Sequence, residues 1–141
     1  MSLEFFNRLS MSLRIRLSEP TEQIAEGLMN QKASPTATIK SLKLHPSVFE
    51  NDDLRDLTPE EMDQVAFDEP EIRLRGYGDE VRHRAPDGKR FTVRDLIAAI
   101  EATELKTRHQ SEWFEGIDTH HTFFEGIRQQ EDGSWKIRWG S

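Results

Sequence analysis

Apolar and polar residues alternate in two stretches of the second half of the chain. In the first stretch Ile72 and Leu74 alternate with arginines, and after Gly76-Tyr-Gly78 the alternation resumes at Val81. A period of two residues is typical of strands with one buried face, and glycines between two such runs favour a turn. The pattern predicts two antiparallel strands between about residues 71 and 85.

A second hairpin is predicted nearer the C-terminal end. The segments from Thr122 to Gln129 and from Ser134 to Trp139 flank Glu131-Asp-Gly133, and Asp-Gly between two extended runs is a strong turn signal. Alternation places Trp135, Ile137 and Trp139 on one face of the last segment and its two cations on the other.

Between the two hairpins the apolar spacing changes to three and four residues. Leu96, Ile97 and Ile100 recur at this spacing, and Thr92 stands before them as a candidate cap. We therefore expect a helix from about Val93 to about Arg108. The fold class that follows is α+β: an antiparallel sheet of about four strands (two hairpins), in the order β-β-α-β-β, covered on one face by this long amphipathic helix.

The first 49 residues give a weaker signal. Apolar residues between positions 13 and 17 alternate with arginines as in a strand, whereas those before them have helical spacing. A short helix is expected after Pro20, and residues 33–38 (Ala-Ser-Pro-Thr-Ala-Thr) are typical of a linker. We expect residues 1–49 to form a partly helical, loosely packed N-terminal arm, and residues 50–141 to form the α+β domain.

Composition limits the function classes. The 141 residues contain no cysteine, which excludes disulfides, thiolate nucleophiles and cysteine-bound zinc. No apolar run is long enough to cross a bilayer and the N-terminus does not resemble a secretory signal, so we expect a cytoplasmic protein without membrane contact. The net charge of −7 disfavours a general role on nucleic acid.

Charge is segregated into blocks along the chain. Residues 50–71 carry one basic and ten acidic residues, whereas residues 72–94 carry seven basic and three acidic ones. Within the acidic block, Thr58-Pro59-Glu60-Glu61 combines a cap, a proline and two glutamates, which together favour the start of a helix.

Six cations are expected on the face of the sheet that the helix leaves uncovered, because they alternate with the apolar residues. Arginine is suited to bidentate pairing with carboxylate or phosphate, so this face is a candidate site for an anion or an acidic partner. Two alternatives are that interleaved carboxylates such as Glu71 and Glu80 neutralise the face, or that the acidic block 50–71 covers it, within one molecule or between two. The candidate residues are Arg73, Arg75, Arg82, Arg84, Lys136 and Arg138.

The segment 113–141 holds six of the twelve aromatic residues and a near-repeat, Trp113-Phe-Glu-Gly-Ile117 and Phe123-Phe-Glu-Gly-Ile127. Most of these aromatics are expected in the core, with a ligand pocket as the alternative. Adjacent strand residues point to opposite faces, so either Phe123 or Phe124 must point outward and is then expected to be covered by another segment or subunit. The candidate pocket residues are Trp113, Phe123, Phe124, His120 and His121.

Three residues of this segment are weak candidates for a metal site, since imidazole and carboxylate ligands together suit zinc, iron or manganese. They are Asp118, His120 and His121. The two histidines are adjacent and would point apart on a regular strand, and no HExxH or comparable motif is present. We therefore expect no cofactor and assign no catalytic residue.

The function that we expect is that of a non-enzymatic binding or assembly module, acting through the Arg-rich face or an aromatic surface. Its partner is expected to be a second copy of the chain or another acidic protein. Two alternatives stay open: a small-molecule or metal-dependent enzyme using Asp118, His120 and His121, and nucleic-acid binding through the Arg-rich face. Phosphate-binding glycine loops and the GxSxG motif of hydrolases are missing from the sequence.

Overall fold

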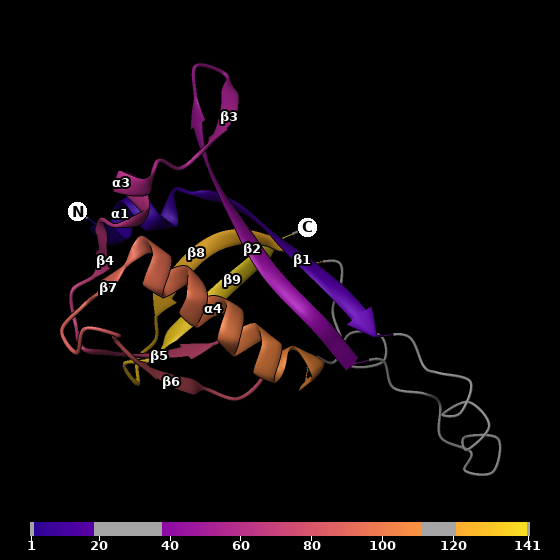
Figure 1. The fold of residues 1–141 in the computed structure, drawn as a ribbon. Coiled ribbons are helices and arrows are strands. Elements are labelled where there is room, and N and C mark those ends of the chain that lie inside the picture. The colour runs from indigo at the N-terminus through magenta and orange to yellow at the C-terminus, as the bar shows by residue number, and fades with distance from the viewer. Residues whose placement is uncertain (1, 19–37, 111–120, 141) are drawn as a thin grey trace, which may run out of the picture.

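The computed structural model describes residues 2–18, 38–110 and 121–140 (Figure 1). The helices of this part are α1 (Ser2–Asn7), α3 (Pro59–Met62), α4 (Val93–Thr107) and the 3-10 turn η1 (Arg108–Gln110). The strands are β1 (Ser10–Ser18), β2 (Thr38–Glu50), β3 (Asp53–Asp56), β4 (Val65–Phe67), β5 (Glu71–Arg75), β6 (Val81–Arg84), β7 (Phe91–Thr92), β8 (Phe123–Gln129) and β9 (Trp135–Gly140).

The main sheet of the described residues has seven strands in the order β3-β2-β1-β8-β9-β5-β6. It is mixed, because β5 pairs with β9 in parallel whereas the other neighbours are antiparallel. The prediction of a four-stranded antiparallel sheet in the order β-β-α-β-β was therefore wrong. Strands β4 and β7 form a separate two-stranded sheet, and α4 lies across one face of the main sheet (Figure 1).

The N-terminal region causes most of this difference, because it supplies two strands of the main sheet instead of a loose arm. Leu13 of β1 lies opposite Leu44 of β2, and both side chains are buried. Phe6 of α1 is fully buried against Phe124, with ring centroids 5.5 Å apart. The alternation between residues 13 and 17 therefore belongs to a long ribbon that is packed into the core.

The boundary expected after residue 49 falls inside β2, which runs from Thr38 to Glu50. The helix expected after Pro20 and residues 33–37 of the expected linker lie outside the described residues.

The locally encoded elements were predicted correctly. Strand β5 pairs with β6, and β8 with β9, as antiparallel neighbours. Helix α4 covers residues 93–107, and Thr92 forms a capping box with Asp95 at its start. Thr58 does the same with Glu61 at the start of α3. None of the described helices is long and apolar enough to cross a membrane.

The alternation on β8 and β9 also holds where the backbone is regular. Ile137 and Trp139 are buried, Trp135 packs at the margin of the core, and Arg138 is exposed. Of the two neighbouring phenylalanines, Phe124 is 2% exposed and Phe123 is 44% exposed. One face of the sheet is therefore the core, and the opposite face, called the outer face below, is mainly polar.

Candidate binding surface

The outer face carries cations from six neighbouring strands, because polar residues alternate with the core residues of each strand. Cross-strand neighbours on this face include Arg14 with Lys43, Arg128 with Lys136, and Arg73 with Arg82. The parallel pairing of β5 with β9 places Arg75 beside Lys136. The two predicted hairpins thus lie in one sheet, and their cations share the outer face with cations of β1 and β2.

The two predicted arginines of β5 have carboxylate partners. Arg73 lies 3.3 Å from a Glu80 oxygen and also donates to the backbone carbonyl of Asp132. Arg75 lies 3.3 Å from the Asp132 carboxylate and donates to the hydroxyl of Ser134 at 3.2 Å. The charge of these two arginines is therefore largely balanced within the molecule.

The turn residue Asp132 organises this end of the sheet. Its carboxylate accepts from both the backbone N–H and the hydroxyl of Ser134, at 2.9 and 2.6 Å. These hydrogen bonds, together with the neighbouring arginines, hold the pKa of Asp132 below its ordinary value. Asp132 therefore stays ionised beside Arg75 at any pH near neutral.

The other four predicted cations differ from one another. The ammonium of Lys136 donates to the backbone carbonyl of Gly76 at 3.0 Å. Arg84 and Arg138 are exposed and have no ion pair within the described residues. Arg82 lies 3.7 Å from Glu71, a loose contact between exposed groups.

Four further cations of the outer face were not among the predicted site residues. They are Arg14 and Arg16 of β1, Lys43 of β2 and Arg128 of β8, all exposed and without an ion pair in the described part of the chain. We call these four residues and Arg138 the cationic patch. The alternation of Arg14 and Arg16 with apolar residues was visible in the sequence, but their neighbours across the sheet were not.

Phe123 lies within this patch. It pairs with Ser12 of β1 on one side and with Gly140 of β9 on the other. Arg14 and Arg138 are two residues further along those strands, which makes them diagonal neighbours of Phe123 at roughly 8 Å. One carboxylate, that of Glu125, lies close to Gly140. The exposed phenyl ring therefore has two arginines and one carboxylate in its surroundings.

Two hollows accompany the patch. One, of about 580 Å³, runs along β1 and β2 and is lined by Arg14, Arg16, Ser41, Lys43, Leu44, His45 and Glu101. Its single carboxylate, Glu101, accepts a hydrogen bond from the backbone N–H of Leu44 at 2.8 Å. The other, of about 390 Å³, is lined by Tyr77, Glu125, Arg128, Gln130, Lys136, Ile137, Arg138 and Trp139. Both hollows are rich in donors that can pair with carboxylates.

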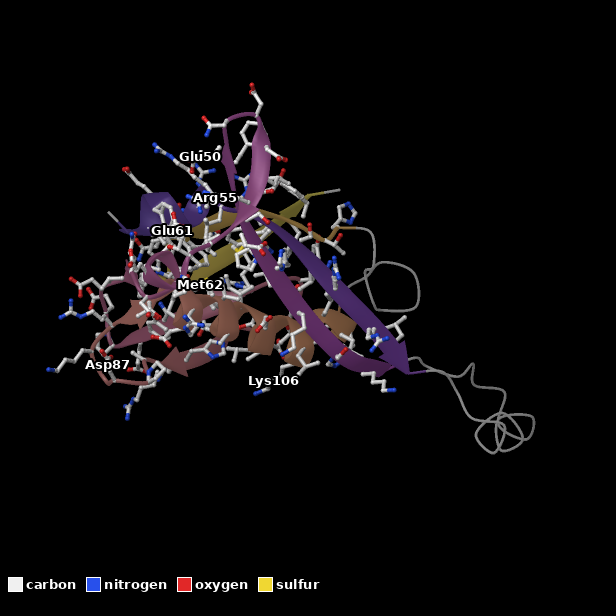
Figure 2. All side chains as sticks on the ribbon, turned by 45° about the horizontal axis from the view of Figure 1, so that its top comes forward. Glu50, Arg55, Glu61, Met62, Asp87 and Lys106 are labelled. Atoms are coloured by element: carbon white, nitrogen blue, oxygen red, sulfur yellow. The ribbon has the colours of Figure 1, made fainter. Side chains whose placement is uncertain are left out.

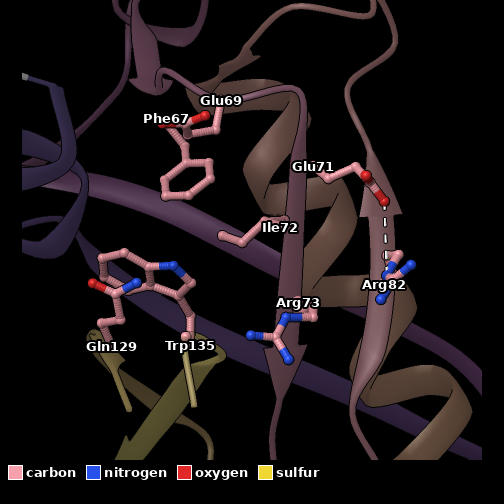
Figure 3. Close-up of a pocket in the computed structure, with 9 residues that line it drawn as sticks. Phe67, Glu69, Glu71, Ile72, Arg73, Arg82, Gln129 and Trp135 are labelled. Carbon is pink, nitrogen blue, oxygen red and sulfur yellow. Dashed lines mark ion pairs between the residues drawn. The ribbon is translucent and has the colours of Figure 1, made fainter. Parts of the chain in front are cut away.

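A third hollow, of about 390 Å³, lies at the corner where β5 begins (Figure 3). Phe67, Ile72 and Trp135 give it an apolar side, with the rings of Phe67 and Trp135 5.5 Å apart and edge-on. Its polar lining consists of Glu69, Glu71, Arg73, Arg82 and Gln129. This mixture of charges suits a zwitterionic or peptide-like group, and two of the predicted arginines contribute to it.

Behind the patch, a charged pair is buried at the end of α4. Glu104 and Arg108 are fully buried and 2.5 Å apart. The guanidinium of Arg108 lies 5.3 Å from the ring centroid of Tyr77 and 5.2 Å from that of Trp139, and it donates to the backbone carbonyl of His121. The backbone at Gly76 approaches Glu104 so closely that a side chain there would collide with the carboxylate. The pair fixes the β5–β6 loop against the helix.

The predicted aromatic pocket and metal site are only partly described. Trp113, Asp118 and His120 lie outside the described residues. The ring of His121 is 6.5 Å from that of Tyr77, whereas Phe124 is in the core and Phe123 is on the outer face. Phe123 and Phe124 therefore do not line one pocket. Within the described residues no group of three or more carboxylates and histidines is placed to hold a metal ion.

One histidine outside the predicted set has a shifted pKa. His83 of β6 is half-buried, and its Nε2 lies 2.7 Å from the hydroxyl of Thr103, which itself donates to the carbonyl of Ala99. Burial, assisted by the charge of Lys106, lowers the pKa of His83 from its ordinary 6.5. His83 is therefore neutral at pH 7 and belongs to the packing of α4 on the sheet.

The acidic block 50–71 does not lie across the cationic patch of its own molecule. It forms β3, α3 and β4, and the β2–β3 hairpin projects from the body of the protein (Figure 1). Comparison of the chain with protein-family models, with curated proteins and with solved structures gave no match, so its function has to be inferred from this geometry.

Proposed function

We propose that the protein is a non-enzymatic binding module whose outer sheet face binds an acidic protein segment. The observation that carries the proposal is the cationic patch: its five cations have no ion pair within the described residues, and two of them, Arg14 and Arg138, are diagonal neighbours of the exposed Phe123. Carboxylates of a partner can pair with such cations, while an apolar side chain of the partner can cover Phe123.

The difference between the cationic patch and the arginines at the β5 end of the outer face supports this assignment. Arg73 and Arg75 already have carboxylate and carbonyl partners, so a ligand would have to displace them. A ligand that binds Arg14 and Arg138 would have no such partners to displace. The two hollows beside the patch offer room for a partner's side chains next to these cations.

An acidic, aromatic polymer tests the proposal directly. We expect a fluorescent copolymer of glutamate and tyrosine to bind the protein at low salt, as followed by anisotropy, and to be released by about 0.5 M salt because exposed charges are screened. The double substitution Arg14→Glu and Arg138→Glu should weaken binding by at least about tenfold, which corresponds to about 1.4 kcal/mol.

A matched control reverses two exposed cations away from the patch, Lys89→Glu and Arg90→Glu, which changes the net charge by the same amount. If both double variants lose affinity equally, binding follows net charge and the patch is not the site. A single-stranded oligonucleotide of similar length serves as the competing ligand. Tighter binding of the oligonucleotide than of the copolymer would replace the acidic protein partner by nucleic acid.

A further inference from the structure

The tip of the β2–β3 hairpin is built for a fixed shape. Glu50 pairs with Asp53, and the two residues between them, Asn51 and Asp52, have φ values of 54° and 64°. Positive φ at both positions is the geometry of a tight two-residue hairpin turn, and Asn and Asp tolerate it better than other residues with side chains. The tip is therefore a defined turn that projects from the body of the protein (Figure 1).

One side of the hairpin is tied to the neighbouring helix. Arg55 donates to both carboxylate oxygens of Glu61 in α3, at 2.8 and 3.1 Å, and to Glu50 at 2.8 Å (Figure 2). These bonds lower the pKa of Glu61 to about 2, so the network stays ionised over the physiological range. The hairpin is thus held in one orientation before any partner arrives.

The opposite side of the hairpin carries an exposed apolar pair next to the exposed Asp56. Phe49 and Leu54 are cross-strand partners, 66% and 53% exposed. They are the two most exposed large hydrophobic residues of the described chain. A preorganised hairpin that presents an exposed apolar pair is typical of an interaction site, because little conformational entropy is then lost on binding.

Phe49 and Phe123 belong to the same face of the sheet. Exposed residues alternate along β2 through Lys43, His45 and Phe49, and the row Phe123, Ser12, His45 crosses the sheet from β8 to β2. Two strand spacings and four residues along β2 separate the two phenylalanines, roughly 16 Å. The surface between them includes Ser10, Ser12 and Ser47, whose small side chains allow a close approach, and it is bordered by the exposed pair of His45 and Asp56.

We propose that two copies of the chain pair through their outer faces, with the Phe49–Leu54 pair of each copy covering Phe123 of the other. This inference rests on the proposed function and names the partner of the cationic patch as a second copy. A two-fold axis lying in the interface, midway between the two apolar sites, satisfies both contacts at once, as a closed dimer requires. The acidic block and the basic face are then complementary between molecules.

Charge favours this occupant over an unrelated apolar partner. The exposed carboxylates of Asp52 and Asp53 at the tip have no ion pair within the described residues. In the proposed dimer these carboxylates lie near Arg14 and Arg138 of the other copy, the diagonal neighbours of its Phe123. Apolar contact at the centre with opposite charges around it is the usual composition of a protein interface.

The oligomeric state of the full chain tests the inference. We expect light scattering and sedimentation at tens of micromolar protein to show a dimer. The substitutions Phe49→Ser with Leu54→Ser, and separately Phe123→Ser, should each raise the dimer dissociation constant at least about tenfold. Leu105→Ser removes an exposed leucine from α4 and should leave the dimer unchanged. Because all these side chains are exposed, circular dichroism and the melting temperature should stay close to those of the parent chain.

A mixture of the two dimer-breaking variants gives the decisive measurement. The hairpin of the Phe123→Ser chain is intact and can cover the intact Phe123 of the Phe49→Ser, Leu54→Ser chain, so one of the two sites is restored. We expect the mixture to form heterodimers at concentrations where each variant alone is monomeric. A dimer that is insensitive to all three substitutions, or a mixture that stays monomeric, would overturn the inference.

The outcomes also separate this inference from the proposed function. A parent chain that stays monomeric at 100 µM while it binds the acidic copolymer through Arg14 and Arg138 excludes self-pairing and leaves the binding function in place. A dimer that fulfils the mixing test but does not bind the copolymer excludes a general acidic ligand and leaves self-pairing as the use of the patch.

Discussion

The two ends of the outer face contain similar numbers of cations but differ in how these are partnered. At the β5–β6 end, Arg73, Arg75 and Arg82 lie within 4 Å of carboxylates, and Arg84 has no ion pair within the described residues. At the β1–β2 end, Arg14, Arg16 and Lys43 have no carboxylate partner in the described part of the chain. An arginine on a strand is therefore available to a ligand only where the turns and neighbouring strands supply no acidic partner.

Arg108 is the extreme case of a partnered arginine, and its loss should have the largest effect. Arg108→Ala would break the buried ion pair with Glu104, and removing one partner of such a pair typically costs about 3 to 5 kcal/mol of unfolding free energy. Urea denaturation followed by tryptophan fluorescence measures this value. Replacing both residues by methionine should restore much of the loss, and a double variant as unstable as Arg108→Ala would contradict the pairing argument.

Asp132→Ala should make Arg75 resemble the arginines of the outer face that have no carboxylate partner. It removes the carboxylate beside Arg75 and the acceptor of the buried Ser134, so the melting temperature should fall, though by less than for Arg108→Ala. At the same time Arg75 becomes available, and affinity for the acidic copolymer should rise. Unchanged copolymer affinity would show that pairing does not control availability.

Acid should lower the unfolding free energy of the protein through His83 of β6. The pKa of His83 is lowered in the folded protein, so its contribution to stability is complete above the unfolded value of 6.5 and is lost as the pH falls below it. Unfolding free energies measured at pH 7.5, 6.5 and 5.5 should decline, and His83→Gln should flatten the decline. An equal slope in the variant would assign it to other groups.

Arg14→Ser should have the smallest effect on the fold. Its side chain is exposed and forms no ion pair within the described residues, so the unfolding free energy should change by less than about 0.5 kcal/mol. Affinity for the acidic copolymer should nevertheless fall several-fold. A destabilised Arg14→Ser protein would indicate that this residue serves the fold and not a ligand.

The sequence allowed the local elements to be predicted, since each has its signal within a few residues. Thr92 with Asp95 and Thr58 with Glu61 cap their helices, and Asp-Gly marks the β8–β9 turn. The parallel pairing of Leu74 with Trp135 and the antiparallel pairing of Met11 with Phe124 have no local signal. The order of the sheet depends on such distant pairings and could not be predicted.

The candidate surface, too, could be predicted only where its signals are local in the sequence. Alternation correctly separated Phe123 from Phe124 and placed the arginines opposite the core. It could not show that the Asp132 turn folds back onto Arg73 and Arg75, or that Arg14 approaches Phe123. The Asn51-Asp52 turn between Phe49 and Leu54 was a readable signal that the sequence interpretation missed.

The place of β8 in the sheet also governs how the protein reaches its fold. The central neighbours β1 and β8 join residues more than a hundred positions apart, so a chain made from its N-terminus cannot complete the middle of its sheet until β8 has emerged. Until then one edge of β1 stays open to other extended chains. Refolding should accordingly be slow, on a timescale of about milliseconds to seconds, as for other proteins dominated by distant strand pairings.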